Sequence, residues 1–225
     1  MISCELQDLQ KCDYDQTWEL QKRYFHSKIE QKQSHRSTEP FQLIFVEHPH
    51  VYTYGKSAED NNMLATPDYL KAMGASVFRI ERGGDITYHG PGQLVAYPIF
   101  DLEKLGMGIK SYVSAIESCI ILTLNDFGIE AGIISDRIGV WIDIGKPTER
   151  KIAAIGIRCS RYVSMHGLAL NVNTDLSMFR HIVPCGIPDK DVTSMERELG
   201  RQIDMNIVKN ALGKHFENTF GLNFI

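Results

Sequence analysis

The sequence contains no run of about 18 apolar residues, so it predicts no membrane-spanning helix. The first residues, MISCELQD, lack the charged segment and apolar core that characterise a secretory signal peptide. The five cysteines are odd in number, widely spaced and without a CxxC pair, which argues against a disulfide framework and a structural zinc site. Together these absences predict a cytoplasmic protein in a reducing compartment.

A strong charge of either sign is also missing. The chain has 24 lysines and arginines against 28 aspartates and glutamates, a net charge of -4, which gives no reason to expect nucleic acid as the main partner. Hydrophobic residues make up 43% of the sequence, enough to bury a core. Because no internal repeat, low-complexity segment or linker interrupts it, residues 1–225 are predicted to form one domain, by default a monomer.

Hydrophobic periodicity and turn residues predict alternating helices and strands. Helices are predicted at 13–35, 67–73, 108–127 and 205–220. Strands are predicted at 41–46, 51–54, 75–80, 94–100, 139–144, 151–157 and 162–172. The strands at 139–144 and 151–157 read as a hairpin, and Pro98 implies an edge strand or a bulge. The mixture predicts an α+β fold with a mixed, largely antiparallel sheet packed with helices.

One stretch, residues 82–93 (RGGDITYHGPGQ), combines four glycines and a proline with several polar side chains. Glycine lets a ligand approach the main chain closely, and polar side chains between bare amides suit a pocket wall. The alternative is a long turn between two strands. The stretch is a pocket wall rather than a turn only if other segments of the chain supply residues that complete a site with it.

Cys185 differs from the other cysteines in its setting. Pro184, Gly186 and Pro188 surround it, which predicts a loop and an accessible sulfur. The alternative for any lone cysteine is an inert, buried side chain. A nucleophilic cysteine needs its thiolate, and a thiol with a pKa of about 8.5 needs a nearby base or cation to form one at neutral pH.

Four residues are candidates for that base: Lys151, His89, His166 and His181. Lys151 opens a strand of small and apolar residues, and an apolar setting lowers a lysine pKa so that the amine acts as a base. The alternative is a solvated lysine at the end of a hairpin.

Small residues recur on the two strands near Lys151. Ala153, Ala154 and Gly156 lie on one, and Gly167 and Ala169 on the other. Two strands that carry small residues leave a volume that an acyl chain would fill. Tight packing of another element against the strands explains the pattern equally well.

The triplet His48-Pro49-His50 suggests a metal site, since histidines two apart on a strand point the same way. No third ligand is identifiable nearby. We therefore predict no metal site.

Four blocks together resemble the lipoyl(octanoyl) transferases of lipoate biosynthesis. The blocks are residues 82–93, KIAAIG at 151–156, HGLALN at 166–171 and PCG at 184–186. They fall in the family's order, and the resemblance spans about residues 41–195. Each block is moderately specific, and their combination is highly so.

The resemblance implies the fold of biotin protein ligases and lipoate-protein ligases. It also implies transfer of an octanoyl group from octanoyl-acyl carrier protein to a specific lysine of a lipoyl domain, without ATP, metal or cofactor. The implied acceptors are the lipoyl domains of 2-oxoacid dehydrogenases and the glycine-cleavage carrier protein. No nucleic acid or membrane takes part.

The resemblance also assigns roles. Cys185 corresponds to the nucleophile that forms an acyl thioester, and Lys151 to the group that lowers its pKa and serves as the base. Asp85 receives no catalytic role. The substrate-binding residues implied are Arg82, Gly83, Gly84, Asp85, Ile86, Thr87, Tyr88, His89, Ala154, Ile155, Gly156, Gly167, Leu168 and Ala169.

Three alternatives remain. An ATP-dependent lipoate or biotin ligase would share Lys151, but it needs no thiol nucleophile, and the chain lacks an obvious GRGRxGR-like adenylate loop. A transferase between other carrier proteins would use the same cysteine and lysine with a different donor. A non-enzymatic fatty-acyl binding protein would keep acyl binding after Cys185→Ser and would form no covalent adduct.

Overall fold

The computed structural model describes residues 1–34, 39–183 and 191–225. Its centre is a sheet in the order β12-β1-β2-β6-β10-β9-β8-β7, with β11 beside β9. The strands are β1 (Ile2–Lys11), β2 (Phe41–Glu47), β6 (Gln93–Ile99), β7 (Gly132–Ile134), β8 (Arg137–Ile142), β9 (Arg150–Ser160), β10 (Val163–Asn171), β11 (Asp191–Val192) and β12 (Leu222–Phe224).

Strand direction makes this sheet mixed and largely antiparallel. The ladders β12·β1, β1·β2 and β11·β9 are parallel, and those from β2 through β6, β10, β9 and β8 to β7 are antiparallel. A second sheet has the order β4-β3-β5 and comprises β3 (Val51–Tyr54), β4 (Ser76–Arg79) and β5 (Ile86–His89). The predicted α+β class is therefore confirmed.

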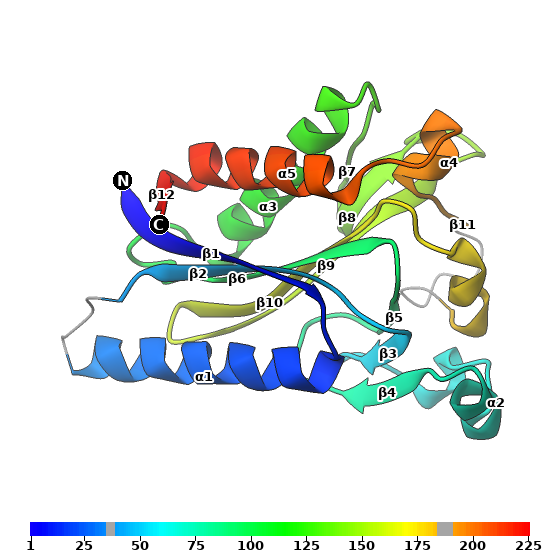
Figure 1. The fold of residues 1–225 in the computed structure, drawn as a ribbon, viewed down its shortest axis with the longest axis horizontal. Coiled ribbons are helices and arrows are strands. Elements are labelled where there is room, and N and C mark those ends of the chain that lie inside the picture. The colour runs from blue at the N-terminus through cyan, green and yellow to red at the C-terminus, as the bar shows by residue number, and fades with distance from the viewer. Residues whose placement is uncertain (35–38, 184–190) are drawn as a thin grey trace.

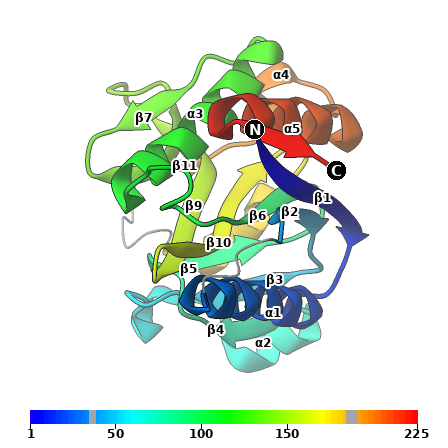
Figure 2. The ribbon, with the colours of Figure 1, turned by 90° about the vertical axis from the view of Figure 1, so that its left-hand side faces the viewer.

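Helices cover both faces of the large sheet (Figure 1). Helices α3 (Ile109–Asp126) and α5 (Met205–Phe220) lie on one face, and α1 (Tyr14–Gln33) lies on the other. Figure 2 shows the small sheet on the same side as α1. Shorter helices are η1 (Asp60–Asn62), α2 (Pro67–Ala72), η2 (Leu176–His181) and α4 (Met195–Leu199).

Two apolar cores follow from this layering. Between the sheet and α3 and α5, the rings of Phe100, Tyr112 and Phe216 are fully buried. On the opposite face, Phe25 of α1 packs with Ile44 and other sheet residues. Tyr112, Phe216 and Phe25 come from the helices, at apolar positions with helical spacing, as periodicity predicts.

The N-terminal strand β1 was not predicted. Its residues alternate between inward and outward positions, but only Cys4 is buried, and five of its ten residues are glutamate, glutamine, aspartate or lysine. Because it pairs in parallel with β2, its place depends on a partner about 35 residues away rather than on a local apolar pattern. The short strands β11 and β12 escaped prediction for the same reason, since their partners β9 and β1 are also distant in sequence. Strand β7 pairs locally with β8, but it is only three residues long.

Pro98 does not lie on an edge strand, because β6 runs between β2 and β10. The aligned β6–β10 pairs stop at Ala96 opposite Leu168. Two residues further back on β10, His166 adopts a left-handed backbone with φ of +62°. Proline is tolerated here because the regular ladder has already ended, so no backbone N–H is required of it.

The described part of the chain contains no helix long and apolar enough to cross a membrane. Within the same residues, no group of three or more histidine, cysteine, aspartate or glutamate side chains is arranged to hold a metal ion. The ring of His48 instead contacts the Cys12 carbonyl oxygen and the Tyr97 hydroxyl, and His50 contacts the Tyr88 hydroxyl.

The turn at Gly92 joins the glycine-rich stretch to the end of β10. Gly92 has a φ of +79°, and its carbonyl oxygen accepts hydrogen bonds from the amides of Val172 and Asn173. A Cβ at Gly92 would lie 2.3 Å from the Asn173 carbonyl oxygen, whereas a Cβ at Gly74, with φ of +68°, would meet nothing within 4 Å.

We therefore expect Gly92→Ala to lower the free energy of unfolding by about 3 kcal/mol or more, because it combines left-handed strain with a main-chain clash. Gly74→Ala is the matched control and should cost about 1 kcal/mol, the left-handed strain alone. Urea denaturation of the two variants measures the difference. Equal losses would contradict this account of Gly92.

Candidate active site

A cavity of about 500 Å³ lies beside the part of β9 that extends beyond its pairing with β8. The pairing of β8 with β9 extends only to Val140 opposite Ala153. Beyond that point the Gly83 amide donates a hydrogen bond to the Ile157 carbonyl oxygen, at 2.9 Å. The glycine-rich stretch thus occupies the open edge of β9 and encloses the space.

Small residues form the floor of this cavity. Ala154 pairs with Ala169, and Gly156 pairs with Gly167, on adjacent strands. A Cβ at Gly156 would lie 2.8 Å from the Gly83 carbonyl oxygen. The small residues therefore serve both purposes that the sequence left open: they admit close approach by the loop, and they leave a hollow beside it.

Arg82 holds the covering loop in place. Its side chain is 8% exposed, its Nη2 donates to the Thr53 carbonyl oxygen at 2.6 Å, and its Nη1 donates to the Gly83 carbonyl oxygen at 3.0 Å. Several donors of one planar guanidinium are thus directed at the backbone of β3 and of the loop itself. Arg82 therefore fixes the loop relative to the small sheet.

Lys151 stands at one end of the cavity. Its Nζ donates to the Ile138 carbonyl oxygen at 3.2 Å and lies 4.6 Å from the centroid of the Trp141 ring. Trp141 is opposite Lys151 in the β8–β9 ladder. The Trp141 ring and the Ile138 carbonyl oxygen thus hold the Lys151 amine in place.

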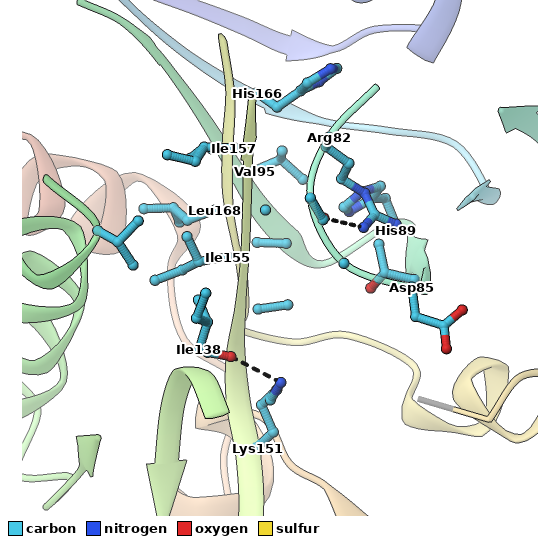
Figure 3. A pocket seen from close by; sticks show the side chains of 18 of the residues that line it. Arg82, Asp85, His89, Val95, Ile138, Lys151, Ile155, Ile157, His166 and Leu168 are labelled. Atoms are coloured by element: carbon cyan, nitrogen blue, oxygen red, sulfur yellow. Dashed lines mark hydrogen bonds between the residues drawn. The ribbon is translucent and has the colours of Figure 1, made fainter. Parts of the chain in front are cut away.

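Figure 3 shows how the labelled lining residues are arranged. Lys151 lies at one end and His166 at the other. Arg82 and His89 lie on one side of the β9 and β10 strands, and the side chains of Ile155 and Leu168 extend toward the other side. The cavity thus reaches around the open edge of β9.

The structure brings most of the predicted site residues together. Those that line the cavity are Lys151, Arg82, Gly83, Gly84, Asp85, Ile86, Thr87, His89, Ala154, Ile155, Gly156, Gly167, Leu168 and Ala169. Tyr88 does not line it: its ring is buried in the core of the small sheet, and its hydroxyl contacts His50. Cys185 lies outside the described residues.

Of the histidines considered as bases, His89 and His166 line the cavity and His181 does not. The His181 ring packs against Tyr69 instead.

Sequence reasoning missed a further set of lining residues, which come from separate elements. They are Tyr14, Ser57, Val95, Tyr97, Ile109, Val113, Asp136, Arg137, Ile138, Trp141 and Ile157. Trp141 could have been found, because a register for the predicted hairpin would have placed it opposite Lys151. Tyr14 offered no local signal, since its ring reaches His89 from the start of α1, with parallel rings 6.2 Å apart.

Two histidines and two tyrosines that line the cavity are uncharged at neutral pH. Burial, reinforced by the neighbouring His48, lowers the pKa of His89 to about 3. Burial, with the charges of Arg82 and Arg158, lowers the pKa of His166 to about 3. Burial raises the pKa of Tyr14 and Tyr97 well above the ordinary tyrosine value. These groups act as neutral hydrogen-bonding partners.

Solved structures define the class of fold. A bipartite lipoate protein ligase from Thermoplasma acidophilum matches all of this chain and 86% of that chain, with a TM-score of 0.75 at 20% identity. A lipoate-protein ligase A bound with ATP matches all of this chain and 88% of that chain, with a TM-score of 0.72 at 20% identity. At these identities the likeness establishes the lipoate-ligase type of fold.

Sequence comparison defines the family. The model of the lipoyl protein ligase A/B catalytic domain matches residues 13–217. Octanoyltransferase from Bacteroides fragilis strain YCH46 is 50% identical over 92% of this chain and 93% of its own length. Octanoyltransferase from Flavobacterium johnsoniae is 48% identical over 96% of each. The chain therefore belongs to the octanoyltransferase family, and it is an acyltransferase.

The buried histidines predict a loss of stability in mild acid. The folded-state pKa values of His48, His89 and His166, about 4, 3 and 3, lie below the ordinary value of 6.5. As the pH falls below 6.5, the unfolded chain binds protons that the folded chain does not, so stability declines toward the folded pKa values. At pH 5 each histidine should cost about 2 kcal/mol.

We expect His89→Gln to remove about 2 kcal/mol of the loss seen between pH 7 and pH 5, measured by urea denaturation at both pH values. His26→Gln is the matched control, because the His26 side chain is exposed on α1. An unchanged pH dependence in His89→Gln would contradict the prediction.

Proposed function

We propose that this acyltransferase moves an octanoyl group from octanoyl-acyl carrier protein to the target lysine of lipoyl domains, through an acyl thioester on Cys185 with Lys151 as the base. The proposed acceptors are the lipoyl domains of 2-oxoacid dehydrogenases and the glycine-cleavage carrier protein, and the protein would act as a monomer without a cofactor. The family and its curated octanoyltransferase relatives support the reaction.

One observation carries the proposal: the Lys151 amine stands at the end of a cavity with a floor of small apolar residues. The cavity volume, about 500 Å³, is within the range of small-molecule pockets. A hydrocarbon chain would lie against the small side chains of Ala154 and Ala169, and its carbonyl group would face the amine. Lysine supplies both the cation and the proton acceptor that a cysteine nucleophile requires.

In the first step, the Lys151 amine accepts the proton of the Cys185 thiol. The thiolate attacks the carbonyl carbon of the octanoyl thioester, and the bond from that carbon to the carrier's sulfur breaks. The departing carrier thiolate takes the proton back from Lys151. Backbone amides near the glycine-rich wall are suited to stabilising the oxyanion of the tetrahedral intermediate.

In the second step, the neutral amine of the acceptor lysine attacks the octanoyl-Cys185 carbonyl carbon, and its nitrogen loses one proton to Lys151. The carbon–sulfur bond breaks, Cys185 regains a proton from Lys151, and an amide forms. The first exchange replaces one thioester by another and is nearly balanced in free energy. Formation of the more stable amide drives the overall transfer, so no ATP is consumed.

The covalent intermediate gives the first test. Incubation of the protein with octanoyl-acyl carrier protein, without ATP, should yield one octanoyl adduct by intact mass spectrometry, mapped to Cys185. A lipoyl domain should discharge it. Cys185→Ser should form no thioester, and Cys159→Ser, a cysteine of β9 outside the cavity lining, is the control that should behave as the wild type. Transfer that proceeds only with ATP would overturn the proposal.

The role of Lys151 gives the second test. Lys151→Ala should slow acylation by about 100-fold or more near pH 7, the usual contribution of a general base, and should recover in part at higher pH as the thiol ionises without help. Lys151→Arg keeps the charge but cannot release a proton, so it separates electrostatic assistance from proton transfer.

Lys110→Ala, an exposed lysine in the first turn of α3, is the matched control. An acylation rate at pH 7 equal to that of the wild type in Lys151→Ala would refute the role of the base.

A further inference from the structure

The peptide group between Ile138 and Gly139 is hydrogen-bonded on both sides by side chains of opposite charge. Its carbonyl oxygen belongs to Ile138 and accepts a hydrogen bond from the Lys151 Nζ at 3.2 Å, drawn as a dashed line in Figure 3. Its N–H group belongs to Gly139 and donates to the Glu117 Oε1 at 3.1 Å. The N–H and C=O groups of a trans peptide point in opposite directions. Glu117 and Lys151 therefore lie on opposite sides of one planar group, which links them.

Glu117 is a buried residue of α3, 7% exposed, and it does not itself line the cavity. Val113, one helical turn earlier on the same side of α3, does line it. Among the described residues, the Gly139 amide is the one hydrogen-bond donor to the Glu117 carboxylate. Burying a carboxylate is costly unless it is hydrogen-bonded, and an apolar side chain would fill the same space at lower cost. Packing alone therefore does not account for a carboxylate at this position.

Gly139 gives the peptide group its orientation. Its φ of +125° is open to glycine and not to residues with a side chain, and φ sets the direction of the peptide group that precedes the residue. A Cβ at Gly139 would lie 2.6 Å from the Ala153 carbonyl oxygen and 3.3 Å from the Lys151 Cε. Glycine thus turns the Ile138 carbonyl group toward the amine and leaves room for the lysine side chain.

A bulge in the β8–β9 ladder brings Lys151 opposite Trp141. Val140 pairs with Ala153, but the next residue, Trp141, pairs with Lys151, so Ile152 is an extra residue on β9. In a regular ladder Trp141 would instead oppose Ile152. Bulges redirect side chains and are frequent beside active sites. The bulge and the peptide group at Gly139 are thus two independent features of the backbone that fix the Lys151 amine.

We propose that Glu117 is a positioning residue for Lys151, acting through the Ile138–Gly139 peptide group. This inference rests on the proposed function, because it takes Lys151 as the base. The Glu117 carboxylate fixes the direction of the N–H group and thereby of the carbonyl group, which holds the amine at the end of the cavity. A base that a third group orients is the usual arrangement beside a nucleophile.

The hydrogen bond to the peptide group is strongest when Lys151 carries the proton it has accepted. An ammonium group is a stronger donor to the Ile138 carbonyl oxygen than a neutral amine. A carboxylate on the far side of the same peptide group polarises that carbonyl further, since hydrogen bonds in a chain strengthen one another. Glu117 exchanges no proton with Lys151, and no covalent bond to it forms or breaks.

Single-turnover acylation by octanoyl-acyl carrier protein tests this role, with the maximal rate and the half-saturating carrier concentration measured separately. Glu117→Leu removes the acceptor, so the maximal rate should fall by about tenfold. Glu117→Asp keeps the charge, but its carboxylate is about 1.5 Å short of its present reach, so the rate should fall to the same extent. Glu117→Gln keeps an oxygen acceptor at the same reach, so the rate should stay within about threefold of the wild type. Because Glu117 does not line the cavity, the half-saturating concentration should change by less than about twofold in all three variants.

Asp101→Leu is the matched control. Asp101 is also a buried carboxylate that accepts a main-chain hydrogen bond, from the Glu103 amide at 3.1 Å, and it does not line the cavity. This variant should lose stability in urea and keep the wild-type acylation rate. Rates in Glu117→Leu and Glu117→Asp that equal the wild-type rate would overturn the inference, as would a rate in Glu117→Gln as low as that in Glu117→Asp. If Glu117→Leu does not fold, the comparison of Glu117→Asp with Glu117→Gln decides.

Absence of an octanoyl adduct in the wild type would instead reject the proposed function. Crystal structures of the variants then decide the inference without reference to activity. The distance between the Lys151 Nζ and the Ile138 carbonyl oxygen should stay near 3.2 Å in Glu117→Gln and exceed about 4 Å in Glu117→Asp. An unchanged distance in Glu117→Asp would refute the positioning role.

Discussion

The hydrogen bond from the Gly83 amide to the Ile157 carbonyl oxygen is the contact on which the site depends. It places the glycine-rich loop on the edge of β9 that β8 leaves open, and it is possible only because Gly156 has no side chain to strike the loop. Arg82 then ties the same loop to Thr53 of the small sheet. The glycine-rich stretch thereby forms one wall of the cavity, and β9 forms the opposite wall.

The cavity has two different ends. At one end the Lys151 amine is held by a carbonyl oxygen and an aromatic ring, and we propose that it serves there as the base. At the other end, burial keeps the rings of His89 and His166 neutral.

Local patterns in the sequence were sufficient for most of the fold, because strong helical periodicity and apolar runs specify elements without long-range help. They failed for β1, whose polar residues form a strand only because β2 is beside it. Local patterns also failed to show that Tyr88 is buried in the small sheet and does not line the cavity. Within β5, Tyr88 faces the core of the small sheet, while Thr87 and His89, its neighbours in sequence, line the cavity. Side-chain direction within a glycine-rich segment depends on which strands pair, and periodicity does not contain that information.

The sequence by itself determined which reactive and flexible residues the protein has and in what order they occur. These are Lys151 before small residues, the glycine-rich stretch 82–93 and Cys185 between proline and glycine, and their combination marks the family. These are properties of residue type and order. Only the tertiary structure decided that Tyr14 and Trp141 join the site, and that the ring nitrogens of buried His166 have no hydrogen-bond partner among the described residues. The physical reason is that register, backbone handedness and layer packing arise from contacts between segments far apart in the chain, which no local pattern records.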